Sequence, residues 1–270
     1  MTVEQLFNLK GRFALVTGAA MGLGRGMAMG LASAGARVVV VDRDEPGAAD
    51  TAKAIRDAGG EAVSFKADMS DPAAIDAIFD FVESDSGRLD ILVNNAGRST
   101  KDAPETVSLA EWELTYRINS TAYLLMAQRA FPYMRKAGGG SIINISSIAG
   151  TGGQGRGSIA YSVSKAAVNQ LTRELAVEWG IYGIRVNAIL PCQIMTPGLK
   201  TYLASPAGAN IFGRWLDGLP MNRLGEIDDL VGPVIFLASP ASAMVTGHLL
   251  AVDGGNVATN ASATVRKAAS

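Results

Sequence analysis

Short apolar runs alternate along this chain with longer amphipathic segments. The first two runs, residues 13–17 and 37–41, are strand-like, and a helical pattern over 25–34 separates them. Strand, glycine-rich turn, helix and strand in this order form one βαβ unit. The alternation then continues, with further strands expected at 62–65, 89–93, 141–145, 184–190 and 248–252, and helices at 48–58, 72–84, 109–137, 158–180 and 226–237.

Two segments depart from this alternation. Residues 195–222 contain prolines, scattered aromatic residues and weak periodicity, and are predicted to form an insertion over the sheet edge that selects the substrate. Residues 257–270 are small and polar and are predicted to form a mobile tail. No linker or change in composition divides the chain, so residues 1–270 are predicted to form one domain.

Composition and charge narrow the classes of protein. Of the 270 residues, 48% are hydrophobic and 18% are charged, which suits a large core and argues against disorder. A net charge of −1 argues against nucleic acid or an anionic membrane as the main partner. Neither a signal peptide nor a membrane-spanning apolar run is expected, and the protein is predicted to be soluble and cytoplasmic.

Cys192 and His248 are the single cysteine and the single histidine of the sequence. They leave no intrachain disulfide, no cysteine cluster, no ordinary histidine-based metal site and no Ser-His-Asp triad. We therefore predict no metal. Cys192 is interpreted as a small buried hydrophobe rather than a reactive thiol, and His248, at the start of the last expected strand, as structural.

A glycine-rich turn follows the first expected strand. Glycines let the backbone pass close to a pyrophosphate, and the N-terminus of the following helix offers free N–H groups and a favourable dipole. Glycines also serve turns and close helix–strand packing, but the strand before and the helix after favour nucleotide binding. The predicted contacts in this turn are Gly18, Met21, Gly22, Leu23 and Gly24.

Asp42 stands at the end of the second expected strand, where a carboxylate can accept hydrogen bonds from ribose hydroxyls. The same carboxylate would repel a 2′-phosphate, so Asp42 favours NAD over NADP. The adjacent Arg43 could accommodate such a phosphate, and Asp42 could also be a plain turn residue. Further cofactor contacts are expected just past the third and fourth strands, at Asp68, Met69, Asn95, Ala96 and Gly97.

Tyr161 and Lys165 are four residues apart at the start of a long helical pattern, so they share one helix face. A phenol normally titrates near pH ~10. A cation held close by would favour the phenolate and lower that pKa, which would make Tyr161 a usable acid and base. Alone, the pair is more often an aromatic stem packed beside a solvated lysine, so its interpretation depends on the rest of the chain.

Ordered motifs over nearly the whole chain resemble the short-chain dehydrogenase/reductase family. They are Thr17-Gly18-x-x-x-Gly22-x-Gly24, Asn94-Asn95-Ala96-Gly97, Ser147 with Tyr161 and Lys165, Asn119 upstream, and Asp253-Gly254-Gly255. The resemblance implies a Rossmann-like, doubly wound α/β fold, with a parallel sheet of seven strands and helices on both faces. It also implies oxidation of an alcohol by NAD(P), or the reverse reaction.

The resemblance also assigns roles. Tyr161 would be the general acid/base, Lys165 would lower its pKa and bind the nicotinamide ribose, Ser147 would hold the substrate oxygen, and Asn119 would hold a water in a relay to Lys165. Pro191, the backbone of Ile194, and Thr196 would lie near the nicotinamide. The chain departs from the family pattern at Cys192, which replaces a glycine, and in the long gap from Ser147 to Tyr161, which leaves Ser146 as the alternative serine.

These features predict an NAD-dependent oxidoreductase acting on a secondary alcohol such as a sugar acid or polyol. An NADP-dependent ketone reductase and a non-catalytic nucleotide-sensing protein are the alternatives. Arg98 and Lys101 border the expected substrate cleft and are either idle surface cations or partners of an acidic substrate. The resemblance also suggests a homotetramer built on the helices at 109–137 and 158–180 and the final strand.

Overall fold

A computed structural model describes residues 1–155, 157–209 and 211–259 and shows one sheet of seven parallel strands. The strand order is β3-β2-β1-β4-β5-β6-β7, which is doubly wound because the order reverses between β1 and β4. The predicted sheet is therefore confirmed. Its strands are β1 (Phe13–Thr17), β2 (Arg37–Asp42), β3 (Glu61–Lys66), β4 (Ile91–Asn94), β5 (Gly140–Ile145), β6 (Ile184–Pro191) and β7 (Leu249–Val252).

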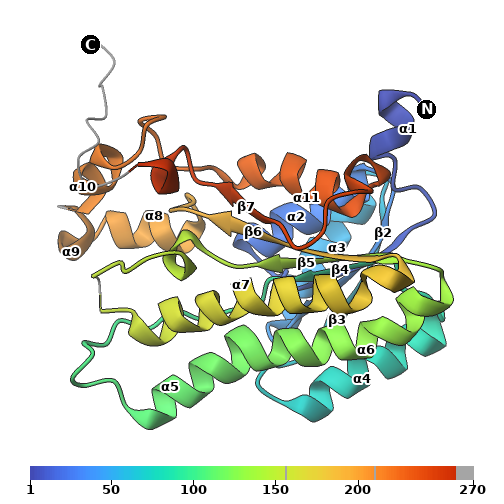
Figure 1. Cartoon of the computed structure of the whole chain (residues 1–270), viewed down its shortest axis with the longest axis horizontal. Coiled ribbons are helices and arrows are strands. Elements are labelled where there is room, and N and C mark those ends of the chain that lie inside the picture. Colours follow the sequence, from blue (N-terminus) through green and yellow to red (C-terminus); the bar gives the residue numbers. More distant parts are fainter. Residues whose placement is uncertain (156, 210, 260–270) are drawn as a thin grey trace.

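Helices cover both faces of the sheet, as Figure 1 shows. One face carries α2 (Gly22–Ser33), α3 (Glu45–Asp57) and α11 (Val231–Ala238), and the other carries α4 (Pro72–Asp85), α6 (Ala122–Lys136) and α7 (Ile159–Trp179). Successive residues of a strand point to opposite faces. In β1, Ala14 and Val16 consequently pack under α2, whereas Leu15 packs under the helices of the other face.

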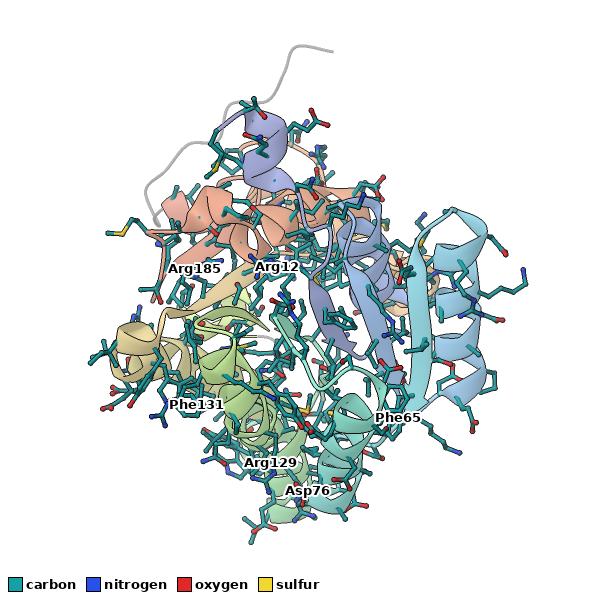
Figure 2. All side chains as sticks on the ribbon, turned by 90° about the vertical axis from the view of Figure 1, so that its right-hand side faces the viewer. Arg12, Phe65, Asp76, Arg129, Phe131 and Arg185 are labelled. Carbon is teal, nitrogen blue, oxygen red and sulfur yellow. The ribbon has the colours of Figure 1, made fainter. Side chains whose placement is uncertain are left out.

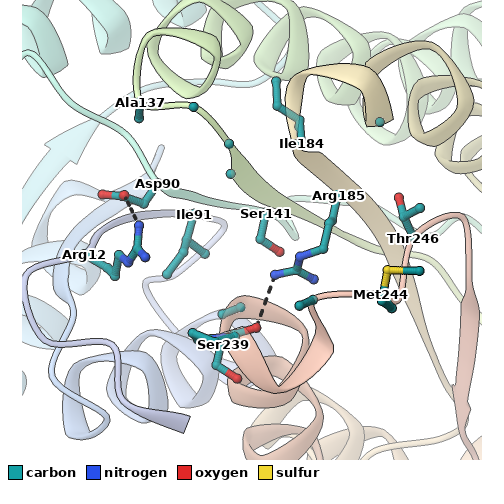
Figure 3. Close-up of a pocket in the computed structure, with 18 residues that line it drawn as sticks. Arg12, Asp90, Ile91, Ala137, Ser141, Ile184, Arg185, Ser239, Met244 and Thr246 are labelled. Atoms are coloured by element: carbon teal, nitrogen blue, oxygen red, sulfur yellow. Dashed lines mark hydrogen bonds and ion pairs between the residues drawn. The ribbon is translucent and has the colours of Figure 1, made fainter. Parts of the chain in front are cut away.

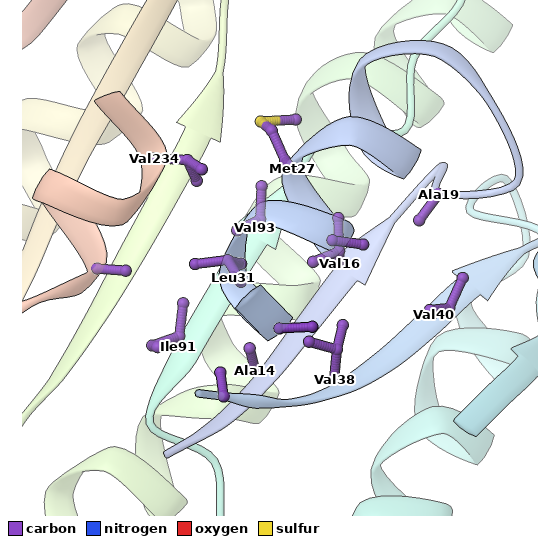
Figure 4. Packing of buried hydrophobic residues seen from close by; sticks show 14 of the residues in the cluster. Ala14, Val16, Ala19, Met27, Leu31, Val38, Val40, Ile91, Val93 and Val234 are labelled. Atoms are coloured by element: carbon purple, nitrogen blue, oxygen red, sulfur yellow. The ribbon is translucent and has the colours of Figure 1, made fainter. Parts of the chain in front are cut away.

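The first of these two cores holds the glycine turn in place. Met27 and Leu31 of α2 meet Val234 of α11 above Val16 and Val93, as seen in Figure 4. All five side chains are completely buried. Burying a side chain of this size stabilises the fold by roughly 1.5–3 kcal/mol, so this cluster anchors the strand and the helix on either side of the turn.

The second core packs the long helices against each other. Phe131 of α6 lies 4.8 Å from the ring of Trp179 of α7. Arg129 of α6 forms a 2.7 Å ion pair with Asp76 of α4 at the surface of the molecule (Figure 2). Because both charges of this pair are about half exposed, it contributes at most ~1 kcal/mol, and apolar packing holds the layer together.

The helix predicted over 109–137 is present from residue 109 to residue 136, but it is not a regular α-helix throughout. It comprises α5 (Leu109–Tyr116), a π-helical turn (Arg117–Thr121) and α6. The wider turn contains the buried Asn119, whose amide bonds to backbone outside the helix. A π-helical turn is a recurrent feature of functional sites because it re-aims one side chain without ending the helix.

The segment predicted as an insertion contains three short helices that the sequence did not show, because each has too few residues for a periodic pattern. They are α8 (Pro197–Leu203), α9 (Pro206–Ala209) and α10 (Ile211–Asp217), and they lie at the end of the molecule opposite α1 (Val3–Phe7) (Figure 1).

Residues 260–270 of the predicted tail lie outside the described residues. No helix in the described ranges is both long and apolar enough to span a membrane. The predicted homotetramer stays a prediction.

Candidate active site

A cavity of about 820 Å³ lies where the strand order reverses, beyond the carboxyl ends of the strands. Ligands of doubly wound sheets bind at this position. The structure thus brings together cofactor residues that were predicted from four separate segments of the chain. Those lining the cavity are Gly18, Met21, Leu23, Gly24, Asp42, Arg43, Asp68, Met69, Asn95, Ala96 and Gly97.

The glycine turn is held from behind by the loop that follows β4. The Asn95 side-chain amide donates to the carbonyls of Thr17 (2.9 Å) and Gly18 (3.0 Å). Gly18 has φ +64°, and a Cβ there would lie 2.8 Å from the Cα of Ala96. The turn therefore requires glycine at this position for its conformation and for its close contact with the second loop.

Helix α2 presents an uncapped N-terminus to this cavity. Its N-cap residue, Met21, makes no side-chain cap in the described chain, whereas Asp44 caps α3 and Asp71 caps α4. Free N–H groups and the helix dipole then remain for an anion, which fits a dinucleotide diphosphate. Gly22 opens this helix, and a Cβ there would be 3.6 Å from the Thr196 methyl group.

Asp42 points at the same turn. Its carboxylate accepts hydrogen bonds from the backbone N–H of Ala20 (3.0 Å) and of Asp44 (3.0 Å). These bonds fix a negative charge at the end of β2, where a ribose would lie. At the far side of the cavity, the Ser70 backbone N–H, together with smaller effects of the Ser70 side chain and Arg43, holds the pKa of Asp68 below its usual value. Asp68 is thus also an ionised acceptor.

Tyr161, in the first turn of α7, lies against Ser147, which follows β5. The Ser147 hydroxyl is close enough to the phenol to act on its pKa, and it accepts from the Ala149 N–H at 3.1 Å. The alternative, Ser146, is engaged elsewhere, because its hydroxyl lies within hydrogen-bonding distance of the Lys165 carbonyl (3.0 Å) and of Asn169 Oδ1 (2.6 Å) and donates its one proton to either acceptor. Of the two serines, the geometry places Ser147 at the phenol.

The electrostatics of the pair differ from the sequence-based expectation. Burial raises the pKa of Tyr161, and the Ser147 hydrogen bond opposes this effect, whereas Lys165 was predicted to lower that pKa. Burial also lowers the pKa of Lys165 to about 7. The reason is orientation. The Lys165 Nζ lies 5.8 Å from the centre of the Tyr161 ring and is bonded to other groups.

Those groups are the Ile145 carbonyl, at 2.8 Å, and the Tyr123 hydroxyl, at 3.3 Å. An ammonium has three protons. Two of the Lys165 protons are thus used inside the protein, and the third is left for a ligand. Because Ile145 ends β5 and Lys165 belongs to α7, this contact also fixes how the helix sits over the carboxyl edge of the sheet.

Asn119 does not contact Lys165 directly. Its side-chain oxygen accepts from the Arg98 N–H (2.8 Å), and its amide donates to the Arg98 carbonyl (2.9 Å) and to Ser164 Oγ (3.0 Å). Ser164 in turn donates to the Tyr161 carbonyl at 2.7 Å. Asn119 therefore clamps the loop after β4 to the first turn of α7. One lone pair of its oxygen remains for the predicted water.

The end of β6 and the segment after it supply three more predicted cofactor residues, Pro191, Ile194 and Thr196. Ile194 is buried and pairs with Gly225 as an isolated bridge, and Thr196 caps α8 by accepting from the Leu199 N–H. Thr196 faces the glycine turn, as described above for Gly22. Cys192 packs against the core, where burial raises the pKa of its thiol, in agreement with a structural role.

Two residues at the site escaped the sequence-based reasoning, Tyr123 and Ser164. Both are near a predicted residue in the sequence. Tyr123 is four positions after Asn119, and Ser164 directly precedes Lys165. Helical spacing from Asn119 would have suggested Tyr123, but the local sequence cannot show that its hydroxyl reaches a lysine 42 positions away.

The two cations near the substrate side are placed differently. Arg98 pairs with Glu111 at 2.7 Å. Lys101 instead lies 3.8 Å above the ring of Tyr202 in α8, and its neighbour Asp102 forms a bridge with Ser158, just before α7. Lys101 thus lies between α7 and α8, where a substrate would enter.

A second cavity, of about 500 Å³, lies at the amino ends of β4, β5 and β6 (Figure 3). Its charged groups are already engaged. Arg12 pairs with Asp90 at 2.8 Å, and Arg185 donates to Ser242 Oγ (2.7 Å) and to the Ser239 carbonyl (3.3 Å). The predicted catalytic residues lie at the opposite, carboxyl edge of the sheet, where Ser147 follows β5 and Lys165 bonds to the last residue of β5.

A doubly wound sheet with a glycine turn, an uncapped helix and a nearby Ser-Tyr-Lys set defines a dinucleotide-dependent oxidoreductase. The family model described as enoyl-(acyl carrier protein) reductase matches residues 18–256. The chain belongs to the short-chain dehydrogenase/reductase family. It is an NAD(P)-dependent enzyme of the alcohol dehydrogenase type, as predicted, and acts on a small molecule.

Relatives match over almost the whole length. The chain is 41% identical to cis-4-hydroxycyclohexanecarboxylate dehydrogenase of Sinomonas cyclohexanicum, over 92% of this chain and 97% of that protein. It is 38% identical to D-threitol dehydrogenase of Mycolicibacterium smegmatis, over 94% and 96%. A solved gluconate 5-dehydrogenase of Burkholderia cenocepacia J2315, in complex with NADP and tartrate, superposes with a TM-score of 0.89 at 34% identity, covering 96% of this chain and all of that one.

Replacing the two neighbouring serines separates catalysis from structure. We expect Ser147→Ala to lower kcat for alcohol oxidation by about 10²-fold or more, because the reacting oxygen loses a preorganised donor. Ser146→Ala should keep turnover within a few-fold and cost about 1 kcal/mol of stability through its lost buried hydrogen bonds. Steady-state kinetics and urea unfolding of both variants make the comparison. The larger kinetic loss in Ser146→Ala would reverse the assignment.

Proposed function

We propose that this protein is an NAD-dependent dehydrogenase of secondary alcohols that carry a carboxylate, such as sugar acids and other hydroxy acids. The observation that carries the proposal is the proximity of Ser147, the Tyr161 phenol and the buried Lys165, whose ammonium lies near Gly97 in the lining of the cavity. This arrangement supplies a proton carrier and an oxygen-positioning group at one place. The cavity beside it supplies room for the dinucleotide.

The bound nicotinamide supplies hydride transfer. The side chains of the protein position the substrate and transfer its proton. Ser147 positions the alcohol oxygen, and Tyr161 accepts its proton during oxidation or returns it during reduction. Lys165 holds the adjacent charge and keeps one proton for a ribose hydroxyl. Asn119 keeps the loop after β4 and the start of α7 in register, so that these groups stay aligned.

The substrate class follows from the entrance of the site. Lys101 rests on Tyr202, a contact that a carboxylate could readily replace because a cation binds an anion more strongly than an aromatic ring at an exposed site. The names of the relatives support the same class, since one acts on a hydroxycyclohexanecarboxylate and another on gluconate. A neutral polyol is the alternative, which the threitol dehydrogenase favours.

The choice of NAD rests on Asp42. Its carboxylate is fixed at the end of β2 by two backbone N–H groups, so it cannot turn away from a 2′-phosphate without losing them. Arg43 lines the same cavity and supports the alternative, as does the NADP bound to the gluconate 5-dehydrogenase of known structure.

Substrate screening tests the proposed class. With NAD, we expect hydroxy acids such as gluconate and cis-4-hydroxycyclohexanecarboxylate to give a kcat/KM at least about tenfold above that of threitol, because Lys101 adds a charge-assisted contact. Lys101→Met should remove most of this difference, with Lys200→Met as the control. The absorbance of the NADH that forms gives the rates. Equal rates for acids and polyols would contradict the proposal.

Cofactor selectivity tests the role of Asp42. We expect Asp42→Ala to weaken NAD binding about tenfold through the lost ribose contacts, and to strengthen NADP binding by removing a repulsive charge beside Arg43. Asp44→Ala, which removes the neighbouring cap of α3, is the control for a general effect on this loop. Fluorescence titration with both reduced cofactors gives the ratio. A wild-type preference for NADPH would refute the NAD assignment.

The rate of oxidation should depend on pH through the buried pair. Below pH about 7 Lys165 is an ammonium and Tyr161 a neutral phenol, so the pair cannot take up a proton. Above that pH the neutral Lys165 amine can take up the proton that Tyr161 gives up as the phenol receives one from the alcohol. Oxidation should therefore rise as pH increases through about 7, and ketone reduction should fall over the same range.

Tyr161→Phe should lower kcat by at least about 10³-fold while NADH still binds. Undiminished turnover of this variant would rule out Tyr161 as the proton carrier.

A further inference from the structure

Tyr123 is a buried tyrosine whose hydroxyl lies beside the catalytic lysine. Its side chain is only 1% exposed, and it belongs to the first turn of α6, directly after the π-helical turn. The hydroxyl accepts from Lys165 Nζ at 3.3 Å and donates to the Ile145 carbonyl at 3.2 Å. The same ammonium lies 5.0 Å from the centre of the Tyr123 ring.

Packing alone does not require a hydroxyl here. A buried phenol loses its contacts with water and is stable only if the protein provides partners. In the described chain, the partners of this hydroxyl are the two groups that also hold each other, since Lys165 donates to the same Ile145 carbonyl at 2.8 Å. The three groups form a closed triangle in which each fixes the other two.

The triangle ties the ammonium to the sheet and to a third helix. Ile145 ends β5, Lys165 stands on α7 and Tyr123 stands on α6. The backbone carbonyl of Tyr123 accepts from the Asn94 amide at 3.4 Å, which connects α6 to the end of β4 as well. A long lysine side chain has many rotamers, and two fixed acceptors restrict it to one direction.

We propose that Tyr123 is a positioning residue that holds the Lys165 ammonium for proton transfer and stabilises its charged form. This inference rests on the proposed role of the Tyr161–Lys165 pair. Tyr123 touches neither substrate nor reacting atoms, so it acts through Lys165 alone. The titratable groups facing Lys165 are Tyr123 from α6 and Tyr161 on its own helix, and the neutral amide of Asn119 lies near it from the π-helical turn.

The sign of the effect follows from the hydrogen bond. The Tyr123 oxygen accepts from the ammonium and so favours the charged form of Lys165. If that oxygen is removed, the buried ammonium keeps one hydrogen-bond acceptor fewer and is less stable, so the pKa of Lys165 falls. The pH at which oxidation begins should fall with it, and the loosely held lysine should also lower the maximal rate.

The test uses Tyr123→Phe in the full-length enzyme. We expect the acid limb of the oxidation profile to move down by about one pH unit, and kcat on the plateau to fall about tenfold. The KM for the alcohol should stay within about twofold. Tyr133→Phe is the matched control, because Tyr133 is on the same helix and donates to the Phe79 carbonyl far from the lysine. It should leave both the limb and kcat unchanged.

A second measurement keeps the contact separate from the proposed catalytic roles. The ¹³Cε signal of Lys165, assigned by its loss in Lys165→Arg, reports the titration of the amine without any turnover. Its midpoint should fall by about one unit in Tyr123→Phe and in Tyr123→Met, which fills the space without a hydroxyl. If Tyr161→Phe retained turnover, the proposed function would fail while this titration would still decide the role of Tyr123.

Two results would overturn the inference. One is a folded Tyr123→Phe or Tyr123→Met in which both the Lys165 midpoint and the acid limb match those of the wild type. The other concerns the wild-type protein and applies even if neither variant folds. The ¹³Cζ signal of Tyr123 must then move with the same midpoint as Lys165, because its hydrogen-bond donor changes charge, and a signal that stays constant through that midpoint would exclude the contact.

Discussion

The arrangement of the active site depends on the burial of one ammonium group. Lys165 is 3% exposed, and a charge in that position is stable only with fixed acceptors around it. The end of β5 supplies one acceptor and α6 supplies the other. The sheet edge and two helices are therefore fixed to each other at the point where we propose the proton chemistry.

From that point, hydrogen bonds extend through the neighbouring segments. The π-helical turn places Asn119 so that it joins the loop after β4 to α7, and Asn95 joins the same loop to the glycine turn. The cavity and the predicted proton-transfer residues are thus connected through one set of loops. A cofactor that orders the glycine turn acts on the same loop that positions Asn119, which provides a direct physical link between binding and alignment.

In several places the residue present is a poor choice for its own helix or loop but makes one of these long-range contacts. Asn119 is a mediocre helix former, yet it lies in the middle of a helical segment, because its amide satisfies backbone groups of the neighbouring loop. The N-terminus of α2 has no side-chain cap, unlike α3 and α4, because that end faces the cavity. A Cβ on Gly97 would lie 3.3 Å from the Asn119 oxygen, so a side chain there would push against the amide that holds this loop.

Patterns within short stretches made much of the fold and site predictable. All seven strands, the cofactor turn and the Tyr161–Lys165 spacing are visible because they depend on neighbours within one element. The short helices α8, α9 and α10 were missed for the opposite reason, since none spans enough residues to show a period. The π-helical turn at Asn119 was not predicted, and the backbone of Arg98, to which Asn119 bonds, lies 21 positions away and outside any local pattern.

The sequence by itself determined the alternation of strands and helices, the residues that meet at the carboxyl edge of the sheet, and the type of chemistry available there. Only the tertiary structure decided the direction of the Lys165 side chain, the choice between Ser146 and Ser147, and the part played by Tyr123. The physical reason is that burial and hydrogen-bond partners are set by segments far apart in the chain. The same two residues, Tyr161 and Lys165, would have opposite pKa shifts if the ammonium pointed at the phenol instead of the end of β5.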